Sequence, residues 1–276
     1  MNNPIKLIAL DLDGTLLNNK KQITPRTQEA LRRCHERGIL CMPATGRPAT
    51  GFPDIAAQMP GFRYALTSNG ALVYDYTDKC AVYEDLLSIE HTLEILEFAK
   101  NYDVMTDIYT NGNGYSTRAN LANVGHYFFA PGMIEYVLKT RIPVDDMREF
   151  VLANNRPVEK IVLFFGDLSL QAILEKDLKR FPYLRVTDAL ENNLELNNVT
   201  ANKGASLLRF GEMMGIRREE TMACGDGRND CDMVAAAGIG VGMENACDEL
   251  KVVADVITTS NEDDGVARAI EKYALV

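Results

Sequence analysis

Residues 5–17 read IKLIALDLDGTLL, a short apolar run followed at once by two aspartates and a glycine. The run from Ile5 to Leu10 has the length and the composition of a β-strand. Because it is apolar without alternation, we expect both of its faces to be buried, as they are in a parallel sheet. Asp11 and Asp13 then follow the strand directly, at the carboxyl edge where open parallel sheets bind ligands.

The segments that follow repeat this pattern of strand and helix. Residues 25–37 have a helical pattern, with Thr24 as the expected N-cap and Gly38 just past the end, and residues 39–44 are the next predicted strand. The alternation returns from Lys203 onward and is typical of parallel sheets. The sequence therefore predicts an α/β fold with a doubly wound, Rossmann-like core. The later elements of this core are expected at 205–214, 221–224, 229–237, 239–241, 256–259 and 266–273.

The middle of the chain predicts a second, smaller α/β unit. A length of 276 residues exceeds the usual size of one domain. A predicted strand at residues 64–67 is followed by a predicted hairpin at residues 71–76 and 80–84, which marks the exit from the core. We therefore expect a discontinuous core at residues 1–83 and 192–276, with an inserted unit at residues 84–191. The inserted elements are expected at 89–102, 104–110, 158–165 and 170–181, with short strands near Leu184 and Leu194.

The composition is that of an ordinary globular protein. Hydrophobic residues make up 46% of the chain and charged residues 25%. The first apolar run has no basic region ahead of it, and no later segment reaches the length of a membrane span. The six cysteines are scattered without a CxxC pair. We therefore expect a cytoplasmic protein with reduced thiols and without membrane association.

The net charge of −10 constrains the binding partners. Without a cluster of lysines and arginines, it argues against binding to nucleic acid or to anionic lipid. A small phosphorylated molecule is still compatible, because a few buried cationic groups determine the local field inside a cleft. For the assembly state we expect a monomer or a weak homo-oligomer.

Asp11 and Asp13 form the first of four polar segments at predicted strand ends. Two carboxylates that leave a buried strand are costly unless a metal ion or a proton transfer compensates them. On these residues alone, an Asp-Gly turn with a capping aspartate explains the sequence equally well. A calcium-binding EF-hand loop is disfavoured, because Leu12, Leu16 and Leu17 interrupt the alternating oxygen ligands that it needs.

The second polar segment, GDGRND at residues 225–230, lies between a predicted strand and a predicted helix. Asp226 would lie in the loop and Asp230 in the first helical turn, where a carboxylate also suits the helix dipole. Capping of the helix explains one aspartate. It explains two acids, Asn229 and two glycines less well.

Two further segments carry groups that suit an anion. Thr45, Gly46 and Arg47 combine a hydroxyl, a flexible main chain and a guanidinium after a predicted strand, and such groups bind phosphate. The same tripeptide occurs in many surface turns. Lys203 opens a predicted helix before Gly204, although a lone lysine is ordinarily solvated. Together, the four segments offer carboxylates for a metal ion and a nucleophile, and a hydroxyl and cations for an anion.

These segments closely resemble, in order, the four motifs of the haloacid dehalogenase superfamily of phosphatases: DLDGTL at 11–16, ATGR at 44–47, NKG at 202–204 and GDGRND at 225–230. The resemblance spans nearly the whole chain. The long insertion, together with SNGA at 68–71 and GVGMENA at 240–246, resembles the Cof-type sugar-phosphatase branch. In that branch the insertion is an α/β cap that opens and closes over the active site, which makes residues 84–86 and the region near Asn192 the expected hinges.

The resemblance implies a role for each matching residue. Asp11 would attack phosphorus and form an aspartyl phosphate. Asp13 would protonate the leaving alcohol and later deprotonate water. Mg²⁺ would be held by Asp11, the main-chain carbonyl of Asp13 and Asp226, and Arg47 would contact the substrate or a surface partner. The remaining roles are phosphoryl binding by the main chains of Leu12 and Gly46 and by Thr45, Lys203 and Asn229, and support of Lys203 or of a metal-bound water by Asp230.

The predicted activity is Mg²⁺-dependent hydrolysis of small phosphomonoesters, such as sugar phosphates or related metabolites. A phosphomutase of the same superfamily is an alternative. A phosphonatase would need a Schiff-base lysine in the cap, and the sequence around Lys160 does not identify one. A non-catalytic sensor of Mg²⁺ or of a phosphorylated metabolite is a further alternative, against which the complete set of acidic and lysine motif residues counts.

The insertion itself contains no motif that identifies a substrate. His35 and His91 have the character of helix-surface residues and lack the spacing of a zinc site. Six residues of the insertion are candidates for lining the substrate site, although core or surface positions explain each of them better: Met105, Tyr109, Tyr115, Arg118, His126 and Tyr127.

Overall fold

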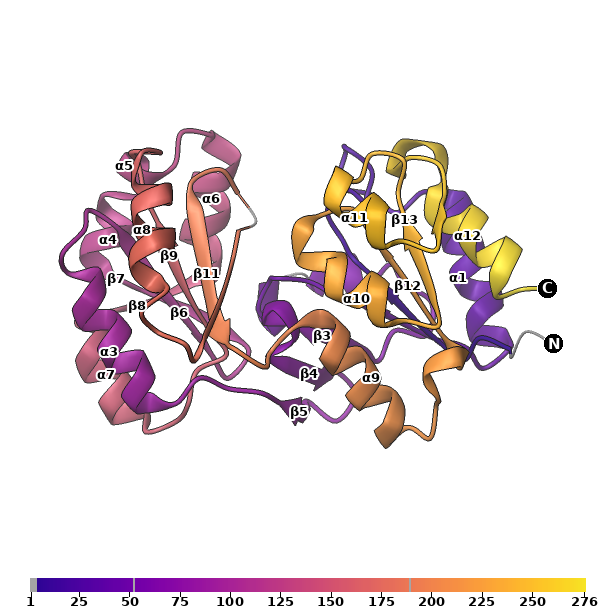
Figure 1. The fold of residues 1–276 in the computed structure, drawn as a ribbon, viewed down its shortest axis with the longest axis horizontal. Helices are drawn as coiled ribbons and strands as arrows, with labels where there is room; N and C mark the ends of the chain where they lie inside the picture. The colour runs from indigo at the N-terminus through magenta and orange to yellow at the C-terminus, as the bar shows by residue number, and fades with distance from the viewer. Residues whose placement is uncertain (1–3, 52, 189) are drawn as a thin grey trace. The chain divides into compact units, whose positions relative to one another are not determined.

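The computed structural model shows the protein as two compact units, both drawn in Figure 1. The described residues are 4–51, 53–188 and 190–276. Among them, no helix combines the length and the apolar character that crossing a bilayer requires. All six cysteines are free thiols, as the sequence predicts. The first unit takes the described residues of 1–47, 52–83 and 202–276, and the second takes those of 48–51 and 84–201.

The chain returns to the first unit later than the sequence indicates. Residues 192–201 belong to the second unit, whereas the sequence analysis assigns them to the core. The reason is strand β11 (Asn193–Asn198), which pairs antiparallel with β9 (Lys160–Phe164) and with β10 (Leu184–Thr187). The main chain of this segment forms its hydrogen bonds in the second sheet, and the first unit resumes at Asn202.

A five-stranded parallel sheet forms the centre of the first unit, as the sequence predicts. It consists of β1 (Leu7–Leu10), β2 (Leu40–Pro43), β12 (Thr221–Gly225), β13 (Ile239–Gly242) and β14 (Val256–Ile257). Their order in space is β14-β13-β12-β1-β2. Since β1 pairs with β2 on one side and with β12 on the other, the strand order reverses at β1. The carboxyl end of such a reversal is where open α/β sheets bind ligands.

Helices cover both faces of this sheet (Figure 1). The side chains of β1 alternate between the two faces, with Ile8 and Leu10 in one apolar cluster and Leu7 and Ala9 in the other. Strand β1 is therefore buried throughout, which accounts for its unbroken apolar run. The first face carries α1 (Pro25–Glu36) and α12 (Gly265–Tyr273), the second carries α9 (Lys203–Met213) and α10 (Cys231–Ala236), and the shorter helices are α2 (Pro53–Ala56) and α11 (Asp248–Val253).

A small antiparallel sheet continues the first unit beyond β2. It is formed by β3 (Tyr64–Thr67), β4 (Leu72–Asp75) and β5 (Cys80–Glu84), where the sequence predicts a strand and a hairpin. The N–H of Thr45 donates to the carbonyl of Leu66 at 2.9 Å. This hydrogen bond holds β3 beside the end of β2, next to the Thr45-Gly46-Arg47 segment.

The second unit is built on a six-stranded sheet in the order β10-β11-β9-β6-β7-β8. Its additional strands are β6 (Met105–Thr110), β7 (Asn113–Thr117) and β8 (Arg141–Val144). Neighbouring strands are antiparallel except for β7 and β8. One face packs against α3 (Ile89–Ala99), α7 (Met147–Asn154) and α8 (Leu170–Leu178), and the other against α4 (Arg118–Ala122), α5 (Val124–Tyr127) and α6 (Pro131–Thr140).

Buried charges lie on the second of these faces. Arg141 donates to Asp107 at 2.6 Å, and Lys160 donates to Glu195 at 2.7 Å. The side chains of both pairs are at most 7% exposed. Burial lowers the pKa of Lys160, although Glu195 opposes the shift. Lys160 is therefore part of the interior of the sheet, where its ammonium is held by an ion pair.

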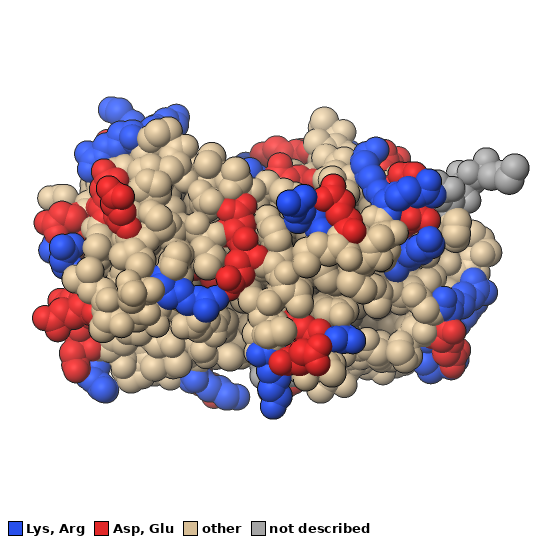
Figure 2. Space-filling model, turned by 90° about the horizontal axis from the view of Figure 1, so that it is seen from below, with Lys and Arg blue, Asp and Glu red and all other residues tan. Residues whose placement is uncertain are grey.

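The charged side chains on the surface are mixed in sign. On the face drawn in Figure 2, lysines and arginines lie among aspartates and glutamates over both units. Some surface charges form ion pairs within a helix, as Arg32 does with Glu29 and Glu36. On this face, therefore, the charged side chains do not form an extended patch of one sign.

Candidate active site

Three carboxylates gather at the carboxyl edge of the parallel sheet. Asp11 follows β1, Asp226 follows β12, and Asp230 ends the 3-10 turn η4 (Arg228–Asp230). One oxygen atom of each lies within 4.8 Å of the others. Asp11 is 8% exposed and Asp230 is 1% exposed, so the cluster is largely removed from water. Like charges this close together repel one another strongly unless cations compensate them.

Lys203 brings a positive charge into this cluster. It is the first residue of α9 and follows the N-cap Asn202. Its Nζ donates to Asp11 Oδ1 at 2.7 Å and to Asp230 Oδ1 at 2.6 Å. Burial favours a lower pKa for Lys203, but the two aspartates outweigh burial and raise the pKa above its usual range. The structure therefore brings the predicted lysine together with two of the predicted acids.

The cluster still lacks positive charge. Three carboxylates and one ammonium leave two negative charges. Burial and the charge of Asp230 raise the pKa of Asp11 well above its usual range, although Lys203 opposes them. Burial also raises the pKa of Asp226 to about 6, against the hydrogen bond from the Thr15 hydroxyl. This set of oxygen donors fits a hard divalent cation.

Gly14 provides the space that Asp226 occupies. Its φ is +89°, and a Cβ atom at this position would lie 2.3 Å from Asp226 Oδ2. The next residue, Thr15, donates from Oγ1 to Asp226 Oδ1 at 2.6 Å. The Asp-Gly turn that the sequence offers as the simpler explanation is present. It also orients a carboxylate from another strand end.

Asp230 combines two functions that the sequence analysis treats separately. Its Oδ2 accepts hydrogen bonds from the N–H groups of Asp226 and Gly227 at 3.1 and 3.0 Å, as a capping residue does. Its Oδ1 accepts from Lys203. The half-buried Asn229 precedes it in the same 3-10 turn, and α10 begins only at Cys231. The GDGRND segment is thus a rigid turn that fixes Asp226 and Lys203 at once.

The carboxylate of Asp13 lies apart from this cluster, between two cations. Lys21 Nζ donates to Oδ1 at 2.6 Å, and Arg47 Nη2 donates to Oδ2 at 2.6 Å. The side chain is 41% exposed. Burial favours a higher pKa for Asp13, but Arg47 and Lys21 outweigh burial and lower it. Nothing in the sequence pattern distinguishes Lys21, because a lysine in a polar turn carries no signal of its own.

The SNGA segment supports the loop of Thr45, Gly46 and Arg47. The N–H of Ser68 donates to the carbonyl of Arg47, and that of Asn69 donates to the carbonyl of Thr45, at 3.0 and 3.1 Å. Ser68, Asn69 and the glycine after them have φ values of 51°, 60° and 98°. Glycine adopts a positive φ without steric cost, whereas Ser68 and Asn69 are strained, and such strain accompanies functional sites. In the sequence, SNGA indicates a family resemblance and does not by itself predict this supporting role.

Thr45 and Leu12 line the same edge of the sheet. Thr45 is 3% exposed, and its Oγ1 accepts a hydrogen bond from the N–H of Arg47 at 3.1 Å. Leu12 is fully buried, and its N–H donates to no other residue that the structure describes. A buried N–H without a protein acceptor can bind an anion.

The candidate residues of the insertion are divided between core and surface. Met105, Tyr109 and Tyr127 are buried, Tyr115 is half-buried, and Arg118 and His126 are exposed. Arg118 pairs with Asp145, and His126 lies 2.7 Å from Asp103. These positions agree with the expectation of core or surface placement.

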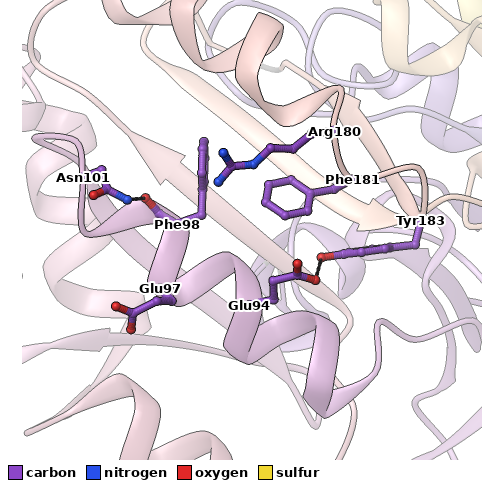
Figure 3. A pocket seen from close by; sticks show the side chains of 7 residues that line it. All are labelled: Glu94, Glu97, Phe98, Asn101, Arg180, Phe181 and Tyr183. Atoms are coloured by element: carbon purple, nitrogen blue, oxygen red, sulfur yellow. Dashed lines mark hydrogen bonds between the residues drawn. The ribbon is translucent and has the colours of Figure 1, made fainter.

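The second unit also has an open pocket of about 420 Å³. Figure 3 shows the guanidinium of Arg180 beside two aromatic rings, with its Cζ 4.7 Å from the ring centre of Phe98 and 4.8 Å from that of Phe181. Tyr183 donates to Glu94 in the same wall. No residue that the sequence analysis selects lines this pocket. Its lining consists of Glu94, Glu97, Phe98, Asn101, Arg180, Phe181 and Tyr183.

The protein combines a parallel α/β core, an inserted α/β unit and an aspartate cluster at the carboxyl edge of the sheet. This combination defines a class of hydrolases. The family described as haloacid dehalogenase-like hydrolase matches residues 8–270, and the chain belongs to this family. The resemblance that the four motifs suggest is thereby confirmed. Hydrolases of this family generally use a divalent metal, which agrees with the buried aspartate cluster.

The chain is similar to named phosphatases over nearly its whole length. It is 30% identical over 274 residues to the 5-amino-6-(5-phospho-D-ribitylamino)uracil phosphatase YcsE of Bacillus subtilis (strain 168), covering 98% of this chain and 96% of that protein. It is also 30% identical over 285 residues to phosphatase YwpJ of the same organism, covering 97% and 99%. A solved haloacid dehalogenase-like hydrolase from Bacteroides thetaiotaomicron is 32% identical, with a TM-score of 0.81 and coverage of 97% and 99%. The protein is therefore a phosphatase, as the sequence predicts.

Proposed function

We propose that this phosphatase hydrolyses small phosphomonoesters, namely sugar phosphates or related metabolites, with Mg²⁺ and through an aspartyl phosphate on Asp11. The observation that carries the proposal is the buried cluster of Asp11, Asp226 and Asp230 around Lys203, with its two uncompensated negative charges. A divalent cation would neutralise them, and a phosphate could then approach a carboxylate without prohibitive repulsion.

In this proposal Asp11, Asp226 and the main-chain carbonyl of Asp13 hold Mg²⁺. Asp230 supports the site and is no ligand, because its oxygens already accept from Lys203 and from two N–H groups. When bound, the ion would neutralise charge on the phosphoryl oxygens and orient them. The same oxygens would be bound by Thr45, Lys203, Asn229 and the N–H groups of Leu12 and Gly46, with Arg47 as a further cation.

The reaction would proceed in two steps. First, an oxygen of Asp11 forms a bond to phosphorus while the bond to the alcohol oxygen breaks, and Asp13 gives that oxygen its proton. Then Asp13 takes a proton from a water molecule, whose oxygen attacks phosphorus and releases Asp11. Lys203 holds Asp11 Oδ1 in place throughout, because it is itself fixed by Asp230.

The substrate class is supported by a relative. YcsE is named for a compound with a phosphate on a ribityl chain, which is the phosphate ester of a polyol. Hydrolysis by this chain would thus be expected to be best for polyol and sugar phosphates. No feature of the described residues favours a phosphomutase, and the phosphatase relatives favour turnover over a sensor that only binds.

The experiment is a phosphate-release assay on a panel of sugar phosphates and p-nitrophenyl phosphate, with Mg²⁺ and with chelator. We expect turnover that needs the metal and is lost by roughly 10³-fold or more in Asp11→Asn, because an amide is a poor nucleophile of nearly the same shape. Circular dichroism should show a folded variant. Activity of Asp11→Asn near that of the wild type would exclude the covalent mechanism, and product analysis would reveal transfer to a second sugar position.

A further inference from the structure

Lys21 belongs to a turn that is unusually well fixed for a surface loop. The side chain of Asn18 accepts hydrogen bonds from the N–H groups of Lys20 and Gln22, both at 3.0 Å. The main chain of the turn closes on itself, since Lys21 N–H donates to Asn18 O at 2.8 Å and Asn18 N–H donates to Gln22 O at 3.0 Å. Lys21 is therefore presented by a defined backbone.

The turn is also attached to the rest of the first unit. The Asn261 side chain donates to the carbonyl of Leu17 at 2.9 Å, and the N–H of Asn19 donates to Glu262 at 2.5 Å. Lys21 itself has a φ of +58°, a left-handed conformation that residues with a Cβ adopt at an energetic cost. Backbone strain that the surroundings hold in place is a mark of functional positions.

The ammonium of Lys21 and the guanidinium of Arg47 share Asp13 between them. Lys21 contacts Oδ1 and Arg47 contacts Oδ2, each at 2.6 Å. The two cations come from different loops. A bound substrate phosphate would contact Arg47 but not Lys21. Arg47 belongs to the Thr45-Gly46-Arg47 loop, and a guanidinium can bind a phosphate bidentately. In the proposed function a bound phosphomonoester therefore competes with Asp13 for Arg47. Lys21 has no such second task at the phosphate loop.

We propose that Lys21 is a positioning residue for Asp13. It holds Oδ1, so that Oδ2 faces the ester oxygen once the substrate phosphate draws Arg47 away. The proton then passes from Oδ2 to the alcohol oxygen, which keeps the electron pair of the breaking P–O bond while Asp11 bonds to phosphorus. In the second step Oδ2 accepts the proton of the attacking water. The proposal rests on the proposed function, in which Asp13 transfers this proton.

The test uses two esters of similar shape that differ in how much their leaving group needs a proton. Phenolate needs protonation as it departs, whereas p-nitrophenolate leaves as a stable anion. We measure kcat/KM with Mg²⁺ for phenyl phosphate and p-nitrophenyl phosphate, because this constant reports the steps up to formation of the phosphoenzyme. Lys21→Met should lower it by about 10²-fold for phenyl phosphate, and by less than about threefold for p-nitrophenyl phosphate.

Three variants make the result specific. Lys20→Met is the matched control, since Lys20 is an exposed lysine of the same turn, whereas the described ion pairs of the Asp13 carboxylate are with Lys21 and Arg47. It should leave both constants unchanged. Lys21→Arg should restore most of the phenyl phosphate activity, because a guanidinium can also reach Oδ1. Asp13→Asn should show the same preference for p-nitrophenyl phosphate as Lys21→Met, and a larger loss.

The role of Lys21 in positioning Asp13 can be overturned by several results. Equal losses for both esters in Lys21→Met, no loss for either, or the same loss in Lys20→Met would overturn the role of Lys21. If Asp13→Asn discriminates between the esters and Lys21→Met does not, Lys21 alone is excluded. If Asp13→Asn itself does not discriminate, the proton role of Asp13 in the proposed function fails, and the role of Lys21 fails with it.

Discussion

Asp11 and Asp13 are two residues apart in the sequence, and their surroundings shift their pKa values in opposite directions. Burial and neighbouring aspartates raise the pKa of Asp11, whereas Arg47 and Lys21 outweigh burial and lower that of Asp13. Carboxylates with such different environments are suited to different tasks. The contrast arises because β1 ends at Leu10 and the chain turns after Asp11, which brings the carboxylate of Asp13 between Lys21 and Arg47 instead of into the aspartate cluster.

At this scale, Gly14 is the residue whose replacement is easiest to interpret. Gly14→Ala should lower the free energy of unfolding by more than the roughly 1–2 kcal/mol of a left-handed alanine, because the new Cβ also meets Asp226. Gly38→Ala is the matched control, since Gly38 has a φ of +73° and open space around it. Urea unfolding gives both values. Equal losses in the two variants would show that Asp226 moves aside freely.

Among the elements, the contact between the start of β1 and the start of β12 is made by Glu220. Its carboxylate pairs with Lys6 at 2.8 Å and accepts from the N–H of Arg217 at 3.0 Å. The hydrogen bond from Lys6, followed by that from Arg217, lowers the pKa of Glu220 to about 2. The unfolded chain has a value of about 4.3 for glutamate, so the carboxylate contributes stability that is present above pH 4.3.

We therefore expect Glu220→Gln to be less stable than the wild type at pH 7, with a difference that shrinks as the pH falls from about 4.3 toward 2. The difference shrinks at low pH because the pKa of Glu220 is lower in the folded state. Between about pH 4.3 and 2 the unfolded chain binds a proton that the folded wild type does not bind, and this favours unfolding of the wild type. Urea unfolding between pH 3 and pH 7 measures the difference. Glu219→Gln, an exposed neighbour in the same turn, should show little effect at any pH.

The elements also show where prediction from the sequence succeeds. Strand β1, helix α1 with its N-cap Thr24, and the β3 strand follow from apolar runs and from capping residues, and the structure has them where the sequence indicates. The helices α4 to α7 and the strands β7 and β8 are missed. Except for α6, these elements span no more than eight residues. The sheet face beside α4, α5 and α6 also buries charged pairs such as Lys160 with Glu195, which no pattern of hydrophobicity reveals.

Only the part of the candidate site that lies at strand and helix ends can be predicted from the sequence. Asp11 and Asp226 directly follow strands of the parallel sheet, and Lys203 is the first residue of a helix that packs on this sheet. Topology alone therefore brings the three residues to one edge. The contacts of Asp13 with Lys21, and of the Ser68 to Gly70 segment with the phosphate loop, depend on the course of irregular turns. Such turns are determined by hydrogen bonds between side chain and main chain, which leave little trace in the sequence.

For the whole molecule, metal binding should stabilise the first unit. Mg²⁺ that binds the folded state alone adds about 2.7 kcal/mol at a concentration 100 times its Kd, and it relieves repulsion among Asp11, Asp226 and Asp230. We expect thermal unfolding at a higher temperature with Mg²⁺ than with chelator, and a smaller shift in Asp226→Asn. Hydrogen exchange should show the added protection at residues 7–17 and 221–230 and little at 105–110. Uniform protection of both units would contradict a site confined to the first.

The hydrogen bond between Lys203 and Asp11 joins positions 192 residues apart. During synthesis, β1 leaves the ribosome long before β12, the strand that covers its other edge. Until then the nascent chain exposes the unpaired edge of an apolar strand, which is a hazard for aggregation. A ribosome-bound chain that ends before residue 203 should therefore need protection by a chaperone and should have no phosphatase activity, so catalysis begins only when translation is nearly complete.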